Sequence, residues 1–201
     1  MTQPRLSILI PTIPSRQNMS MMLFDKVIKH LPFDDVEILV LLDNKTKSIG
    51  EKRENLVQSC TGKYFMFLDD DDDFENLEDV YHATFSNVDV ITFKSLCRNT
   101  DKTQYIVTHR LGNEVEHNCD GEGRYLDCNR PPFHNCAWNS KYKKFHFPFV
   151  NYAEDWGWLK QFVYDAKTEW HIDKTVYKYN FDSNVSEAST ETNSEWKNPN
   201  Q

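Results

Sequence analysis

Five consecutive aspartates, Asp69 to Asp73, are the residues of this sequence best suited to chemistry. They follow an apolar run, Tyr64 to Leu68, that is typical of a strand buried on both faces. Carboxylates packed so closely repel one another and raise one another's pKa unless a cation neutralises them. Because open α/β sheets bind ligands at the carboxyl ends of their strands, we expect a hard divalent metal with oxygen ligands here. A solvated acidic turn is the alternative interpretation.

Two further strands are expected before the aspartates and help to position them. Apolar runs at 6–10 and 36–42 predict buried strands, the first of them central, parallel and ended by Pro11. Asp43 stands at the carboxyl end of the second run. With helical segments in between, residues 1–74 follow a β-α-β-α-β pattern, which predicts a doubly wound α/β half.

Two helices are expected in these connections. The first has apolar residues at helical spacing and lies between Ser15, its expected cap, and Pro32, which ends it. The second is capped by Ser48 and reaches about Cys60, and Gly62 closes it.

After residue 74 the pattern predicts a mixed arrangement. The expected elements are a helix at 76–85, a strand at 88–93, a hairpin at 103–117 turning at Gly112-Asn113, a loop at 119–132, a helix at 152–166 and a strand at 169–181. We expect one domain over 1–185, with halves 1–95 and 96–185, and a polar tail at 186–201.

Composition restricts the class of protein. At 201 residues, with 39% hydrophobic and 13% aromatic residues, the chain can bury the core of one domain. The net charge of −8 argues against a nucleic-acid partner, which needs a basic face, but allows a nucleotide held by a metal and a few cations. No apolar run approaches the ~18 residues of a membrane span, and Met1 to Ser7 does not resemble a signal peptide.

The five cysteines are odd in number and irregularly spaced, which favours reduced thiols in a cytoplasmic protein, of the host if the source is viral. Three of them, Cys119, Cys128 and Cys136, lie near His117 and His134 in the sequence and could be interpreted as a zinc site. The absence of a Cys-x-x-Cys pair from the sequence disfavours that interpretation.

The usual nucleotide-binding fingerprints are missing. The first predicted strand runs into Pro11-Thr12-Ile13-Pro14, with neither Gly-x-Gly-x-x-Gly nor a Walker loop. A dinucleotide-dependent dehydrogenase and a P-loop enzyme are therefore poor fits. A metal held by the aspartates is another way to neutralise phosphates.

Several segments, in order and spacing, resemble the family 2-type glycosyltransferases with the GT-A fold. They are Leu6 to Thr12 as the opening strand, Gly50 to Arg53 followed by Gly62-Lys63-Tyr64, Leu68 to Asp72 as the Asp-x-Asp strand, Ala153 to Trp156 as the Glu-Asp motif, and Tyr177 to Tyr179. The resemblance spans 6 to about 185 and is greatest to short, single-domain viral or bacterial members. It implies a Rossmann-like, mostly parallel sheet flanked by helices, with a smaller mixed acceptor-side half.

The resemblance also implies contacts to a nucleotide sugar, normally a UDP-hexose. Asp43 would accept a hydrogen bond from uracil, with Pro11 and Thr12 under the base, although an ordinary strand-end turn is the alternative for Asp43. Arg53 would face the diphosphate, and His134 would contact the donor. An exposed helix position is the alternative for Arg53, and a structural role is the alternative for His134.

For the aspartates, the resemblance assigns Asp69 and Asp70 to the ribose and phosphates and Asp71 to Mn²⁺ or Mg²⁺. Because the run is five residues long, Asp72 or Asp73 could take the metal role instead. His171 corresponds to a late histidine that some GT-A enzymes use as a metal ligand, but we do not expect that role for it.

The resemblance makes Glu154 and Asp155 the catalytic pair, with Asp155 as the general base that takes the proton of an acceptor hydroxyl. This predicts inversion at the anomeric carbon. A dipole preference of acidic residues for a helix start is the alternative. The acceptor would be a glycan, lipid-linked or protein hydroxyl, and Trp138, Trp156 and Trp158 are its candidate contacts, unless they are plain core.

Three alternatives to an inverting transferase stay open. The first is a retaining transferase on the same fold, which needs no such base. The second is a nucleotidyltransferase, although 11–15 is not the glycine-rich, basic loop that this class usually has. The third is a carbohydrate- or calcium-binding module, although Glu75-Asn76 follows the aspartates where an EF-hand needs glycine.

Overall fold

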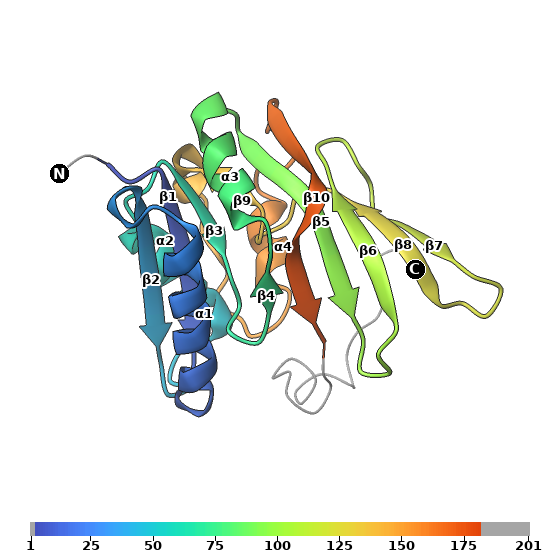
Figure 1. Cartoon of the computed structure of the whole chain (residues 1–201), viewed down its shortest axis with the longest axis horizontal. Helices are drawn as coiled ribbons and strands as arrows, with labels where there is room; N and C mark the ends of the chain where they lie inside the picture. Colours follow the sequence, from blue (N-terminus) through green and yellow to red (C-terminus); the bar gives the residue numbers. More distant parts are fainter. Residues whose placement is uncertain (1–2, 182–201) are drawn as a thin grey trace.

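A mixed ten-stranded sheet is the centre of the computed structural model, which describes residues 3–181 (Figure 1). The strands are β1 (Leu6–Thr12), β2 (Val36–Leu42), β3 (Tyr64–Phe67), β4 (Asp73–Phe74), β5 (Val90–Arg98), β6 (Gln104–His109), β7 (Glu116–Cys119), β8 (Tyr125–Arg130), β9 (Ala137–Asn139) and β10 (Glu169–Asn180). Hydrogen-bonded neighbours follow the order β2-β1-β3-β9-β5-β6-β8-β7, and β10 pairs with β5 and β4. The predicted tail at 186–201 lies outside the described residues.

Helices cover both faces of the sheet. They are α1 (Gln17–His30), α2 (Ile49–Ser59), α3 (Leu77–Ala83) and α4 (Glu154–Leu159). In β1, Leu6, Ile8 and Ile10 pack with α1 and α3, whereas Leu9 packs with α2 and α4. Because alternate side chains of a strand point to opposite faces, a strand covered on both faces must be apolar throughout. This arrangement confirms the predicted α/β class, with β2-β1-β3 parallel and the rest mixed.

β1 continues to Thr12, so the prediction that Pro11 ends this strand is wrong. The Leu9 carbonyl accepts a hydrogen bond from the Leu68 N–H, so the backbone polar groups of Leu9 face β3. Those of residue 11, two positions further along the strand, face the same side. β3 has already ended at Phe67, opposite Leu9. No strand partner therefore needs the N–H group that proline lacks.

β2 lies at the edge of the sheet, which corrects the prediction of a strand buried on both faces. It pairs with β1, and its side chains are half-buried or exposed, with Leu42 at 48% exposure. An aliphatic run does not distinguish an edge strand from a central one in a parallel sheet.

The two predicted helix caps differ in outcome. Ser48 caps α2, because its Oγ accepts a hydrogen bond from the Glu51 N–H at 3.1 Å, as predicted. Ser15 does not cap α1, which is a correction. A 3-10 turn at Pro14–Arg16 precedes this helix. Arg16 occupies the N-cap position, and its side chain makes no capping hydrogen bond to the helix.

Gly62 does not close α2, which ends at Ser59. A Cβ atom at residue 62 would lie 2.4 Å from Ser7 Oγ, so this glycine allows β1 and the start of β3 to approach each other closely.

The predicted hairpin at 103–117 is wrong. β6 pairs antiparallel with β5 and parallel with β8, and the hairpin is formed by β7 and β8. Gly112 does adopt a left-handed conformation, with φ of +81°, but in the connection between β6 and β7. β8 lies within the expected loop at 119–132, because its mostly polar residues lack the apolar signal of a buried strand.

The remaining predicted elements are present with shifted ends. α3 is shorter than 76–85, β5 extends beyond 93, α4 stops at Leu159 rather than at 166, and β10 agrees with 169–181. β4 and β9 are additional, and β9 lies antiparallel between β3 and β5. β5 crosses the expected boundary at 95/96, so a continuous sheet includes strands of both expected halves. No helix within 3–181 has the length and apolar character needed to cross a bilayer.

Candidate active site

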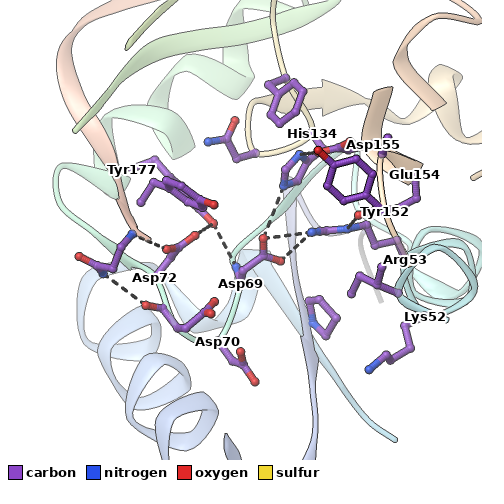
Figure 2. Close-up of a pocket in the computed structure, with 18 of the residues that line it drawn as sticks. Lys52, Arg53, Asp69, Asp70, Asp72, His134, Tyr152, Glu154, Asp155 and Tyr177 are labelled. Atoms are coloured by element: carbon purple, nitrogen blue, oxygen red, sulfur yellow. Dashed lines mark hydrogen bonds and ion pairs between the residues drawn. The ribbon is translucent and has the colours of Figure 1, made fainter. Parts of the chain in front are cut away.

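A cavity of about 720 Å³ opens at the carboxyl ends of β1 and β3 (Figure 2). Its walls come from the β1–α1 connection, α2, the acidic run, the start of α4, and strands β5, β6, β8 and β10. The predicted site residues that line it are Pro11, Thr12, Arg53, Asp69, Asp70, Asp71, His134, Glu154, Asp155 and Trp156. Folding therefore brings together most of the predicted residues from distant segments.

The aspartates nearest the cavity mouth share one cation, Arg16. Asp70 accepts a hydrogen bond from Thr12 Oγ1 at 2.6 Å and lies 3.0 Å from Arg16 Nη1. Asp71 lies 2.9 Å from the same nitrogen. Asp70 and Asp72 are only 5% and 9% exposed, so the interpretation as a solvated acidic turn is wrong.

The last two aspartates hold neighbouring elements together. Asp72 accepts hydrogen bonds from the Tyr177 hydroxyl at 2.6 Å and from the Asn180 N–H at 2.7 Å. Asp73 accepts from Lys26 Nζ and does not line the cavity. The Asp72 carboxylate thus binds β10, and the Asp73 carboxylate binds α1.

Burial and charge act in opposite directions on these carboxylates. Burial raises the pKa of Asp69, but Arg53 and His134 lower it by more, so this pKa lies well below its usual range. Burial, together with the charges of Asp69 and Asp70, raises the pKa of Asp71 to about 6. The negative charge of Asp71 is therefore compensated only in part by Arg16, and an added cation beside it would be stabilised.

The carboxylate oxygens of the acidic run are the kind of ligand that a divalent cation needs. Carboxylate oxygens are the ligands that Mn²⁺ and Mg²⁺ prefer. Asp69 Oδ1 is buried without a hydrogen bond from any described residue, although it lies 3.0 Å from Arg53 Nη2. No three His, Cys, Asp or Glu side chains within 3–181 are grouped closely enough to hold a metal in this arrangement. The contacts of Arg16 with Asp70 and Asp71 would have to open to admit one.

Arg53 is the buried cation of the site, at 4% exposure. Its Nε donates to Glu154 Oε1 at 3.1 Å and its Nη2 to Asp69 Oδ2 at 3.0 Å. Burial would lower the pKa of Arg53, but the two carboxylates raise it, so the guanidinium stays charged. Its Nη1 is buried and has no hydrogen-bond partner among residues 3–181. A cationic donor in this state, on the wall of a cavity, suits an anionic ligand.

The Glu154-Asp155 pair stands at the start of α4, and the two carboxylates contact different residues. Glu154 is 6% exposed and pairs with Arg53. Asp155 accepts a hydrogen bond from the Trp156 N–H at 2.6 Å, and its Oδ2 lies 3.5 Å from His134 Nδ1. Glu154 thus faces the buried cation, and Asp155 lines the cavity.

His134 connects the two sides of the site (Figure 2). Its Nε2 lies 3.6 Å from Asp69 Oδ2, opposite the Nδ1 contact with Asp155. Together with Arg53, which contacts Asp69 and Glu154, these contacts connect the end of β3 to the start of α4.

Several lining residues are missing from the sequence-based prediction. Arg16, Lys52, Tyr177 and Arg130 all line the cavity. Arg16 could have been found as a cation just after the first strand, and Lys52 as the neighbour of Arg53. No pattern in the sequence shows that the Tyr177 hydroxyl reaches Asp72.

Two of the three tryptophans proposed for the acceptor belong to the core, which is a correction. Trp138 and Trp158 are fully buried, and their rings pack edge-on with centroids 6.0 Å apart. Neither lines the cavity, so neither can offer a ring face to a ligand. Trp156 does line it.

Asp43 closes a turn and is not among the lining residues. Its carboxylate accepts hydrogen bonds from Thr46 Oγ1 and from the Lys47 N–H, which agrees with the strand-end alternative. His171 lies outside the cavity as well, with its Nδ1 3.0 Å from Thr92 Oγ1.

The three cysteines considered for zinc lie in different environments. Cys119 is exposed on β7, Cys128 packs with Cys97 and Val107, and Cys136 is buried in the core under α2 and α4. Burial raises the pKa of Cys136 to about 12. A shared zinc site is therefore not formed.

Comparisons with known proteins agree on the fold. No protein-family model matches the sequence, and no curated protein matches it either. The structure is similar to crystal structures of S. aureus TarS residues 1–349 in complex with UDP (TM-score 0.65, 17% identity, 88% of this chain and 60% of that chain) and with UDP-GlcNAc (0.68, 16%, 94% and 61%). This chain thus spans about 60% of the length of these structures. TarS is a GT-A-type glycosyltransferase, and the present chain has the GT-A fold.

Proposed function

We propose that this chain is a metal-dependent glycosyltransferase that moves a sugar from a UDP-linked donor to a hydroxyl acceptor. The observation that carries the proposal is Arg53, a buried guanidinium whose Nη1 lacks a partner within 3–181, on the wall of a carboxylate-rich cavity. The TarS structures contain UDP and UDP-GlcNAc, which supports a UDP-linked donor and makes UDP-GlcNAc the first sugar to test. A cytoplasmic location stays a prediction from the sequence.

On the donor side, cations offset the charge of a diphosphate. Those that line the cavity near the β1–α1 connection and α2 are Arg16, Lys45, Lys47, Lys52 and Arg53. Arg53 Nη1 would donate to a phosphate oxygen, while Glu154 and Asp69 hold the guanidinium in place. Pro11 and Thr12 would lie under the base, whereas the turn contacts of Asp43 leave it out of this proposal.

A Mn²⁺ or Mg²⁺ ion held by Asp71, with Asp69 and Asp70 beside it, would act as a Lewis acid on the leaving diphosphate. The raised pKa of Asp71 supports this placement, because it follows from burial and from the charges of Asp69 and Asp70, and a bound cation would offset these effects.

On the acceptor side, Asp155 would accept the proton of the attacking hydroxyl. His134, 3.5 Å from the Asp155 carboxylate, would keep it oriented, and Glu154 would act through Arg53 as a positioning residue. A base that activates the acceptor implies single displacement and inversion at the anomeric carbon.

The proposal is tested by incubating the protein and Mn²⁺ with UDP-, GDP- and dTDP-sugars and measuring nucleotide release and the product anomer. Asp155→Asn is expected to reduce transfer about 10²- to 10⁴-fold, with UDP affinity unchanged. The control is Asp173→Asn, an exposed carboxylate outside the cavity, which should keep full activity. Near-normal turnover by Asp155→Asn would refute the base assignment, and a wild-type protein that binds no UDP by calorimetry would refute the transferase.

A further inference from the structure

Arg130, at the end of β8, lines the cavity but takes no part in the donor chemistry described above. It makes no ion pair with any residue of 3–181, and its Nε is buried without a hydrogen-bond partner in that part of the chain. Arg16 and Arg53, by contrast, each contact two carboxylates. Arg130 is thus a cation of the cavity whose charge the described residues leave uncompensated.

The neighbours of Arg130 show where its charge acts. Burial lowers the pKa of His109 on β6 to about 4, and Arg130 contributes to the lowering. Burial lowers the pKa of His117 on β7, and Arg130 lowers it further. Burial raises the pKa of Cys128 on β8, and Arg130 opposes that rise. The guanidinium therefore acts on residues of three neighbouring strands, and an anion placed beside it would be stabilised.

A row of rings extends from the cavity along the same strands. Tyr105 on β6 lines the cavity, and its ring centroid lies 5.2 Å from that of Tyr125 on β8. The Tyr125 ring lies 4.8 Å from the ring of His117, and Tyr125 is 42% exposed. Tyr179 on β10 also lines the cavity. It lies opposite Cys97 on the neighbouring strand β5, and Cys97 lies opposite Tyr105 on β6. These strands form the end of the sheet farthest from α1 and α2 (Figure 1).

Aromatic rings that are apolar on their faces and partly exposed are suited to stack on the apolar faces of sugar rings. The row is continuous with the cavity that contains Asp155, so a ligand lying along it would reach the proposed base. The cation in the same region adds a preference for negative charge. A sugar chain that carries acidic groups satisfies both features.

We propose that the face formed by β6, β8 and β7 is an acceptor subsite for an acidic carbohydrate, with a carboxylate or phosphate on Arg130 and sugar rings on Tyr105 and Tyr125. This inference rests on the proposed function, because it assigns the acceptor of the same site. The alternatives are that the acceptor is neutral or that Arg130 binds the donor, and the test below distinguishes both from the proposal.

The test measures binding of two probes by calorimetry in the presence of UDP and Mn²⁺: tetragalacturonate, which carries carboxylates, and the uncharged galactotetraose. Wild-type protein is expected to bind tetragalacturonate and to bind galactotetraose more weakly. Arg130→Gln should weaken tetragalacturonate about tenfold or more, as expected for a lost hydrogen bond between charged groups, and leave UDP affinity unchanged. The matched control is Arg124→Gln in the turn of the same hairpin, whose arginine is exposed and already paired with Asp120.

Tyr125→Ala keeps the proposal testable if Arg130→Gln unfolds the protein, because Tyr125 is exposed; it should weaken both sugars several-fold. Unchanged tetragalacturonate affinity in Arg130→Gln, equal binding of the neutral sugar, or no sugar binding by wild type would each overturn the proposal. A parallel loss of UDP affinity in Arg130→Gln would also overturn it and assign Arg130 to the donor. Tetragalacturonate binding without any UDP binding would instead refute the transferase and keep the anion subsite. To test phosphate as the anionic group, inorganic phosphate is titrated as a competitor, and it should displace tetragalacturonate from wild type.

Discussion

Charge is arranged differently on the two walls of the cavity. On the wall formed by β1, β3 and α2, Arg16 and Arg53 each contact two carboxylates. On the wall formed by β6 and β8, Arg130 makes no ion pair with a carboxylate within 3–181. The arginines of the first wall are held by carboxylates of the fold, whereas the arginine of the second wall has no such ion pair among the described residues.

Desolvation explains why the difference matters. A buried charge is tolerated when a partner of opposite charge is buried with it, and removal of one partner leaves the other uncompensated. Arg53 and Glu154 are such a pair, at 4% and 6% exposure. Arg130 is half-buried, and no carboxylate in the described part of the chain is paired with it. Equivalent substitutions on the two walls should therefore differ in their effect on stability.

The largest expected difference is between Arg53→Met and Arg130→Met. Arg53→Met leaves Glu154 and Asp69 without their counter-charge and should lower the free energy of unfolding by about 3–5 kcal/mol. Arg130→Met removes a cation without a described partner and should change it by less than about 1 kcal/mol, in either direction. Urea denaturation of both variants at pH 7 measures the two effects. Equal losses would show that Arg130 is as much a structural residue as Arg53.

A smaller difference is expected between Tyr177→Phe and Tyr105→Phe. Tyr177 is 2% exposed, and its hydroxyl donates to Asp72 and accepts from the Asp69 N–H. Its loss leaves buried polar groups unsatisfied, which costs about 1–3 kcal/mol. Tyr105 has no such hydrogen bond to a carboxylate of residues 3–181, so its substitution should cost less than about 1 kcal/mol. Denaturation midpoints compare the two, and a larger loss for Tyr105→Phe would contradict the division between the walls.

The smallest effect concerns pH. The folded pKa of Asp71 is raised to about 6, so the folded protein binds more protons than the unfolded chain between about pH 4 and 6. The contribution of Asp71 to stability is therefore fully present below that range and is lost as pH rises through 6. In metal-free protein, Asp71→Asn should gain about 1–2 kcal/mol relative to wild type between pH 4 and 7. Asp173→Asn is the control, because Lys94 lowers the pKa of that exposed carboxylate. A stability difference that does not change with pH would refute the raised pKa.

Much of the first half of the fold could be predicted from local patterns. β1 and β3 match apolar runs, and Ser48 caps α2, because burial on both faces and capping leave direct traces in the sequence. β8 and β9 could not be found in this way. β8 is mostly polar, and β9 has three residues, so neither carries a period that a window of sequence can detect.

The sequence predicted which residues form the candidate site better than it predicted the contacts between them. Arg53, Asp69 and the Glu154-Asp155 pair do meet in one cavity. Their contacts were not predictable, because a pairing such as that of Arg53 with Glu154 joins residues far apart in the chain. The prediction of Trp138 and Trp158 as acceptor contacts was wrong, because the sequence does not show which aromatic rings the fold buries.

The sequence by itself determined the α/β class, the strand that delivers the aspartates and the carboxylate chemistry at its end, because these follow from apolar runs and from residue types within one short segment. Tertiary structure alone decided that Asp72 binds β10 and Asp73 binds α1, that Asp70 and Asp71 share Arg16, and that Arg130 has no ion pair within 3–181. The physical reason is that burial and charge compensation depend on which distant groups come within a few ångströms, and local sequence does not contain that distance.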